Sequence, residues 1–169
     1  MRTNIKFAKV RDGAVIPTKR DEDAGFDIYA NFDEDFMLIY PHKTSMIPTG
    51  IACACSSDYC LIAKERGSTG TKGIAQRCGV IDSGYRNEIF IPITNTNDGI
   101  LVIAKKNVSL KDVFGGTTPN NCIIYPYEKA ISQLLVLPVP YVDVEECTYD
   151  ELKLIPSQRG GGCLGSSGK

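Results

Sequence analysis

The chain has 169 residues, enough for one domain with a hydrophobic core but short for two. Hydrophobic residues make up 43% and charged residues 23%, which excludes a disordered chain and is typical of a globular protein. With 19 basic and 20 acidic residues the formal net charge is −1, which argues against nucleic acid as a partner and leaves small anionic ligands open.

The first six residues lack the apolar core of a secretory signal, and no stretch approaches the roughly 20 apolar residues of a membrane span. We therefore expect a cytoplasmic protein that does not contact a membrane. Its seven cysteines are an odd number, which favours reduced thiols. Cys53, Cys55 and Cys60 raise the alternative of a zinc site. However, alternation over residues 51–55 places the first two on one face of a strand, so buried core thiols are favoured.

Short runs of β-branched and aromatic residues recur between turn signals at intervals of roughly 8–12 residues, which predicts an all-β sandwich or barrel. The predicted strands are 4–9, 25–30, 36–40, 45–54, 59–64, 78–81, 85–94, 100–104, 122–127 and 130–137. Helical periodicity is limited to a short turn near 68–73 and a segment over 148–153. In that second segment Thr148 would cap the helix and Glu151 would follow three residues later.

Two segments depart from this rhythm. Residues 107–121 are expected to form a surface loop longer than a hairpin requires. Residues 157–169 contain five glycines and almost nothing to bury, so we expect a mobile arm. The predicted organisation is one domain over residues 1–156, followed by the arm over residues 157–169.

Residues 79–86 read as a strand, a Ser-Gly turn and a returning strand, which is a tight hairpin. Its backbone could offer donors and acceptors to a planar ligand. Asp82 follows two apolar residues and could be a partly desolvated general base for water, while Tyr85 could lie against a sugar. The alternative is a plain hairpin in which Asp82 is the turn residue and Tyr85 packs across the strands.

Two further segments suit phosphate. In residues 66–73, glycines and hydroxyls expose backbone N–H groups beside Arg66 and Lys72, although a solvated loop would have the same composition. In residues 159–168, glycines follow Arg159 and could wrap backbone amides around an anion; a flexible tail is the alternative. Asp27 lies within an apolar strand, where a carboxylate needs a partner such as an arginine or metal-bound water.

Five segments in this order, residues 24–28, 66–69, 79–86, 131–134 and 159–168, resemble the five motifs of the trimeric dUTPases. The resemblance covers nearly the whole chain, and the third motif is the most specific. It implies a distorted, jelly-roll-like β-barrel that assembles as a homotrimer with sites at subunit interfaces. The reaction implied is hydrolysis of dUTP to dUMP and pyrophosphate, assisted by Mg²⁺.

The same resemblance assigns roles to residues. Asp82 would activate the attacking water, Tyr85 would pack on the deoxyribose, and Asp27 would support Mg²⁺ through water, with the metal held mainly by the triphosphate. The remaining substrate-binding positions implied are Arg66, Gly67, Ser68, Thr69, Gly79, Val80, Ile81, Gln133, Arg159, Leu164, Gly165, Ser166 and Ser167. The chain departs from the motifs at positions where the family usually carries other residues: Gly67, Asn87, Glu128–Ala130, Cys163 and Leu164.

Two rival functions remain. A dCTP deaminase of the same fold needs a glutamate on the strand after the hairpin, and Pro92 occupies that position here, which disfavours deamination. A dUTP-sensing regulator could use residues 107–121 to bind a protein partner. Retention of Asp82 favours hydrolysis over sensing alone.

Overall fold

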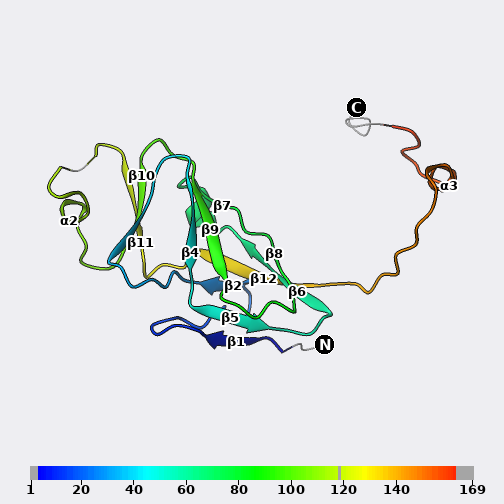
Figure 1. Cartoon of the computed structure of the whole chain (residues 1–169), viewed down its shortest axis with the longest axis horizontal. Helices are drawn as coiled ribbons and strands as arrows, with labels where there is room; N and C mark the ends of the chain where they lie inside the picture. Colours follow the sequence, from blue (N-terminus) through cyan, green and yellow to red (C-terminus); the bar gives the residue numbers. More distant parts are fainter. Residues whose placement is uncertain (1–3, 118, 163–169) are drawn as a thin grey trace. The chain divides into compact units, whose positions relative to one another are not determined.

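The computed structural model describes residues 4–117 and 119–162. It contains two compact units, Met1–Val139 and Pro140–Lys169, each described here by itself (Figure 1). The strands are β1 Lys6–Lys9, β2 Gly25–Ile28, β3 Phe36–Ile39, β4 Thr44–Pro48, β5 Ile51–Ala54, β6 Tyr59–Lys64, β7 Ile74–Gln76, β8 Val80–Ile81, β9 Phe90–Asn95, β10 Ile100–Ala104, β11 Cys122–Pro126 and β12 Ser132–Pro138. The helices are α1 Gly67–Gly70, α2 Leu110–Phe114 and α3 Tyr149–Leu154.

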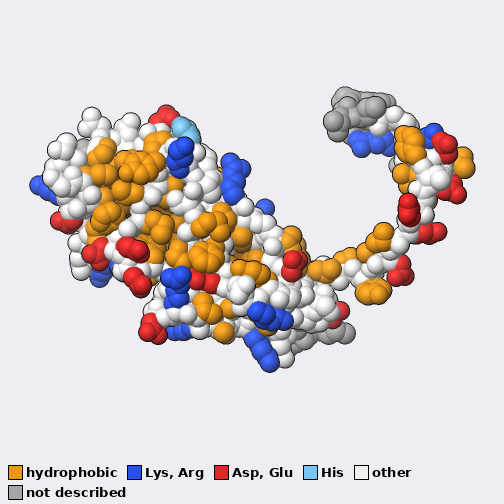
Figure 2. All heavy atoms as spheres, viewed as in Figure 1, with side chains coloured by type: hydrophobic (Ala, Val, Ile, Leu, Met, Phe, Trp, Pro, Cys, Tyr) orange, Lys and Arg blue, Asp and Glu red, His pale blue; other side chains and the backbone are white. Residues whose placement is uncertain are grey.

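The all-β, jelly-roll-like class is confirmed. In the described residues the strands of the first unit form four small sheets rather than one closed barrel, with the orders β1-β5, β11-β10-β3, β2-β12-β6-β8 and β4-β9-β7. Isoleucines from different sheets meet in one hydrophobic core, among them Ile28, Ile39, Ile47, Ile51 and Ile91, none of which is exposed. On the face drawn in Figure 2, further hydrophobic side chains gather over β10 and β11.

The predicted strand 45–54 is wrong as a single element, because the chain turns at Gly50. This glycine has a φ of 66°, and a Cβ there would lie 2.7 Å from the Cβ of Ala14 and 2.8 Å from Oδ1 of Asn31. The turn sends β4 and β5 into different sheets. Strand β7 was not expected; it is a three-residue strand that follows Gly73, whose φ is 67°, and it pairs with β9.

The predicted hairpin over 79–86 is also wrong in its second half. Strand β8 pairs with β6, with Ile81 opposite Leu61, and the chain then turns, with the backbone N–H of Tyr85 donating to the carbonyl of Asp82 at 3.0 Å. No returning strand pairs with β8 among the described residues. The next strand, β9, begins at Phe90 and belongs to another sheet.

Residues 107–121 are a crossover connection that contains a helix. Strands β10 and β11 pair in parallel, and two successive parallel strands need a connection of a dozen or more residues. Helix α2 lies in this connection, capped at its start by Ser109 and at its end by Gly115 with a φ of 63°. At the connection's far end a Cβ on Gly99 would lie 1.8 Å from the carbonyl oxygen of Asn121, so the two backbones meet closely here.

The second unit contains α3. Thr148 caps it and Glu151 completes the capping box, as predicted. The hydroxyl of Thr148 holds the pKa of Glu151 below its usual value. Across the part of the chain that the structure describes, no helix is long and apolar enough to cross a membrane. The mobility predicted for residues 157–169 stays a prediction, and residues 163–169 lie outside the described part.

The cysteines behave as core or surface thiols. Cys53 on β5 is buried, as predicted, and burial raises the pKa of its thiol. Burial likewise raises the pKa of Cys55. The six described cysteines are free, and no cluster of metal-ligating side chains forms among the described residues.

Candidate functional site

Strand β12 brings three of the sequence motifs together. It pairs with β2, where Gln133 lies opposite Asp27, and with β6, where Gln133 lies opposite Lys64. Arg66 follows β6 by two residues and leads into α1. The register of β12 therefore fixes the carboxylate, the arginine and the amide side by side.

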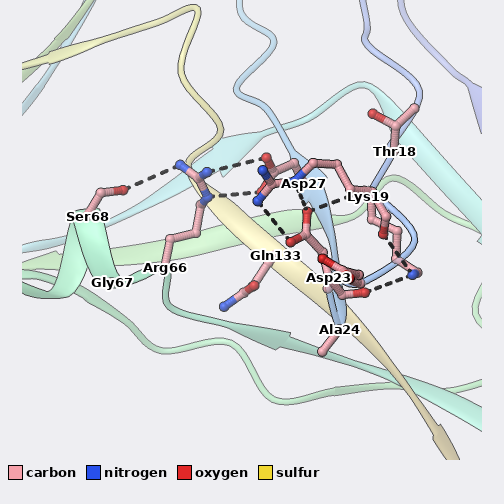
Figure 3. A pocket seen from close by; sticks show the side chains of 12 residues that line it. Thr18, Lys19, Asp23, Ala24, Asp27, Arg66, Gly67, Ser68 and Gln133 are labelled. Carbon is pink, nitrogen blue, oxygen red and sulfur yellow. Dashed lines mark hydrogen bonds and ion pairs between the residues drawn. The ribbon is translucent and has the colours of Figure 1, made fainter.

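These residues line a pocket of about 810 Å³ (Figure 3). The walls come from the turn before β2, from β2 itself, from the start of α1 and from β12. The lining residues are Thr18, Lys19, Arg20, Glu22, Asp23, Ala24, Gly25, Asp27, Arg66, Gly67, Ser68 and Gln133. Of the residues predicted to bind substrate, Arg66, Gly67, Ser68 and Gln133 are in this pocket, together with Asp27.

Arg66 is fixed by hydrogen bonds on three sides of its guanidinium. Nε forms an ion pair with Oδ1 of Asp27 at 3.0 Å, and Nη2 donates to Oδ2 at 3.3 Å. Nη1 donates to the hydroxyl of Ser68 at 3.4 Å and to the carbonyl of Ala130 at 3.2 Å. In Figure 3 the guanidinium lies between Ser68 and Asp27. Asp27 thus has the arginine partner that its position in an apolar strand required.

Two buried side chains hydrogen-bond to backbone groups that hold this arginine in place. Thr69, 1% exposed, donates from its hydroxyl to the Arg66 carbonyl and accepts the Arg66 N–H at 3.1 Å. The hydroxyl of Tyr125 donates to the carbonyl of Ala130 at 2.6 Å, the same carbonyl that Arg66 uses. Burial raises the pKa of Tyr125. Thr69 therefore shapes the turn, and its predicted role in substrate binding stays a prediction.

Gln133 explains why a glycine occupies position 25. The side chain of Gln133 donates from Nε2 to the carbonyl of Glu65 at 2.8 Å and lies over Gly25. A Cβ on Gly25 would come within 2.7 Å of Oε1 of Gln133. A larger residue at position 25 would displace the amide from the pocket wall.

The turn before β2 was missed as part of the site. Lys19 donates from Nζ to three backbone carbonyls of this turn, the shortest being 2.8 Å to Asp23. Arg20 forms a two-point ion pair with Asp23, and this hydrogen bond lowers the pKa of Asp23. The run of charged residues at 19–23 reads as a solvated surface loop. Its position directly before the first motif was the signal that could have marked it.

Asp82 and Tyr85 do not line the pocket around Arg66. Asp82 is exposed in the single chain, because Ile81 points into the core and the next side chain faces outward. Its predicted partial desolvation stays a prediction. Tyr85 is 39% exposed, and its hydroxyl donates to the carbonyl of Glu88 at 2.9 Å. Arg86 closes the turn by donating to the carbonyls of Ser83 and Tyr85. Gly79 and Val80 are exposed on the same segment.

Strand β6 separates the two groups of residues. Ile81 pairs with Leu61 near the start of β6, and Asp82 lies beyond that pair, whereas Arg66 lies past the other end of the strand. At about 3.3 Å per residue, the separation along the strand is on the order of 15–20 Å. That distance exceeds the reach of one side chain, so a single copy does not bring Asp82 to Arg66.

The pocket walls suit an anion with a divalent cation. Three basic side chains, Lys19, Arg20 and Arg66, line the pocket together with three carboxylates, Glu22, Asp23 and Asp27. Carboxylates supply hard oxygen atoms of the kind that Mg²⁺ prefers. Both carboxylate oxygens of Asp27 are already paired with Arg66, one by an ion pair and one by a hydrogen bond, so Asp27 fits a contact through water better than direct ligation. Arg159 is exposed in the second unit, and Leu164, Gly165, Ser166 and Ser167 lie outside the described residues.

The family model for dUTPase matches residues 11–108. The deoxyuridine 5'-triphosphate nucleotidohydrolase of Mycobacterium tuberculosis is 27% identical over 173 residues, covering 99% of this chain and 97% of the relative. That of Leptospira interrogans is 32% identical over 103 residues, covering 59% of this chain and 70% of the relative.

Solved structures of low sequence identity share the fold. The Staphylococcus bacteriophage 80alpha dUTPase with dUPNHPP has a TM-score of 0.74 at 20% identity, covering 98% of this chain and 99% of that one. A mutant dUTPase from phage phi11 of S. aureus, described as revealing the coordination of a structural Mg(II) ion, has a TM-score of 0.65 at 17% identity. It covers 85% of this chain and 96% of that one.

Proposed function

This chain belongs to the dUTPase family and is a dUTP diphosphatase, and we propose that its active site is shared between copies of the chain. The products are dUMP and pyrophosphate. The observation that carries this proposal is the separation of Asp82 from the pocket around Arg66 by the length of β6. The site thus has two halves on each chain. The half around Asp82 holds the general base, and the half around Arg66 holds the residues that would bind phosphate.

The half that contains Asp82 binds the nucleoside and supplies the base. The backbone of residues 79–81 hydrogen-bonds uracil, and Tyr85 lies against the deoxyribose where a 2′-hydroxyl would sit. The Asp82 carboxylate accepts a proton from the water that attacks the α-phosphorus. Its exposure in the single chain supports this arrangement, because the carboxylate is free to be covered by another copy.

The half that contains Arg66 binds the triphosphate of the nucleotide held by a neighbouring copy. Arg66, Ser68, Gln133 and the backbone of Gly67 contact phosphate oxygens. The guanidinium of Arg66 is preorganised for this contact, because its ion pair with Asp27 fixes its orientation before phosphate binds. When bound, Mg²⁺ would neutralise charge on the phosphate oxygens, and Asp27 would support it through water.

The proposed assembly is a homotrimer, in which the arm of a further copy contributes Arg159 to the site. The substrate contacts predicted for Leu164, Gly165, Ser166 and Ser167 lie outside the described residues. The apolar side chains that gather over β10 and β11 support burial between copies (Figure 2). The predicted cytoplasmic location stays a prediction. The protein partner predicted for residues 107–121 stays a prediction.

The test is pyrophosphate release from dUTP, dCTP, dTTP and UTP, each with and without Mg²⁺. Asp82→Asn should lower turnover of dUTP by roughly two to four orders of magnitude, the usual share of a positioned base. Binding of a non-hydrolysable dUTP analogue should survive, since the amide fills the same space. Near-normal turnover by Asp82→Asn would refute its role as base. Light scattering that shows an active monomer would refute the shared site.

Deamination of dCTP is not favoured. Pro92 lies within β9 opposite Met46, and a proline side chain cannot transfer a proton. Ammonia release from dCTP, measured in a separate assay, would reverse this conclusion.

A further inference from the structure

Glu88 has a nearly buried carboxylate with three fixed partners. Its side chain is 11% exposed. Oε1 accepts the backbone N–H of Thr49 at 3.1 Å and that of Gly50 at 2.8 Å. Oε2 accepts from Nε of Arg11 at 3.0 Å. A carboxylate that leaves water needs such partners, and these three come from the turn between β4 and β5 and from the segment after β1.

The backbone around Glu88 is tied to the same turn. The N–H of Ile89 donates to the carbonyl of Ile51 at 2.7 Å. The hydroxyl of Thr49, itself buried, donates to the carbonyl of Ile89 at 2.6 Å. The carbonyl of Glu88 is therefore held in place from both sides. That carbonyl is the acceptor for the hydroxyl of Tyr85 at 2.9 Å.

We propose that Glu88 is a positioning residue that fixes the ring of Tyr85 and thereby sets the preference of the enzyme for deoxyribose over ribose. The inference rests on the proposed role of Tyr85 at the sugar. A ring rejects a 2′-hydroxyl by shape when it cannot move aside. The hydrogen bond from the Tyr85 hydroxyl to the Glu88 carbonyl holds the ring. The hydrogen bonds of the Glu88 carboxylate hold that carbonyl in place.

Three variants of Glu88 distinguish the length of its side chain from its charge as the property that holds Tyr85 in place. Glu88→Gln keeps an oxygen that can accept from the N–H groups of Thr49 and Gly50, but its amide nitrogen cannot accept from Arg11. Glu88→Asp keeps the charge but is one methylene shorter, so its carboxylate withdraws from both amides. Glu88→Ala removes every side-chain contact.

The experiment measures kcat and KM for dUTP and for UTP in these three variants and in Tyr85→Ala, with the unfolding temperature of each protein. A matched control is Asp112→Ala. Asp112 also accepts a backbone N–H, from Ser109 at 2.9 Å, but it belongs to α2 in the crossover between β10 and β11. Its loss should lower the unfolding temperature without changing the ratio of the two kcat/KM values.

We expect Glu88→Ala and Glu88→Asp to narrow the preference for dUTP by roughly tenfold, the equivalent of one hydrogen bond to a charged group. The change should come from better use of UTP, with kcat for dUTP changing by less than about threefold because Asp82 is retained. Glu88→Gln should keep the preference within about threefold of the original value, since its oxygen still reaches the two amides.

Two failures are distinguishable. If Tyr85→Ala leaves the preference unchanged, the proposed role of Tyr85 is wrong and the inference falls with it. If Tyr85→Ala narrows the preference while folded Glu88→Asp does not, Tyr85 acts without this anchor and only the inference is overturned. Because Glu88→Asp retains the charge, it supplies this answer even if Glu88→Ala does not fold.

Discussion

A subunit-mixing experiment tests the shared site most directly. One chain carries Asp82→Asn and a second carries Arg66→Ala, so each assembly of identical chains lacks one half of every site. In a mixed assembly, a site is intact when its Asp82 comes from the Arg66→Ala chain and its Arg66 comes from the Asp82→Asn chain. The separation along β6 requires these two residues to come from different copies.

The size of the effect follows from random assembly. With equal amounts of the two chains, each condition holds for half of the positions, so about a quarter of the sites are intact in a cyclic assembly. Pyrophosphate release after joint unfolding and refolding should therefore recover to about a quarter of the unmodified rate. Before the chains exchange, simple mixing of the two preformed proteins should give no recovery.

A chain with both substitutions, refolded with the unmodified chain, provides the control. Shared sites predict that about a quarter remain intact, whereas sites built within one chain predict about half. Complete absence of recovery in the first mixture, together with half activity in the second, would show that each copy builds its own site. That result would refute the argument from β6.

Three further changes test single features. Asp27→Ala should weaken binding of a non-hydrolysable dUTP analogue by about fivefold in calorimetry, since the two-point pair with Arg66 is partly exposed and contributes only ~1 kcal/mol. Gly99→Ala should lower the free energy of unfolding in urea by at least about 2 kcal/mol, because its Cβ would collide with the backbone entering β11. Iodoacetamide near pH 8 should label exposed Cys147 well before Cys53, whose pKa burial raises, so that less thiolate is present; equal labelling rates would contradict that burial.

Much of the candidate pocket could be predicted from the sequence. Asp27, Arg66 and Gln133 were named from three separate segments, and the structure brings them together along β12. The capping of α3 by Thr148 was equally predictable, because a capping box is a local pattern. Both features could be predicted because each corresponds to a short sequence pattern, either a motif or a local capping box.

Features that depend on distant pairing could not be predicted. An alternating run of residues does not reveal that Gly50 will split it, because the reason is the approach of Ala14 and Asn31 from elsewhere in the chain. The Ser-Gly turn after Asp82 suggested a returning strand, but β8 pairs with β6 instead. The exposure of Asp82 follows from that pairing and has no local signature.

The parallel pairing of β10 and β11 limits how the connection between them can change in evolution. A hairpin loop can shrink to two residues, whereas a parallel crossover cannot fall below roughly 10–12 residues without reversing one strand. Lengthening is unrestricted, so related chains are free to elaborate this region but not to dispense with it. Attempts to map a binding partner here should therefore exchange surface side chains of α2 rather than delete the segment.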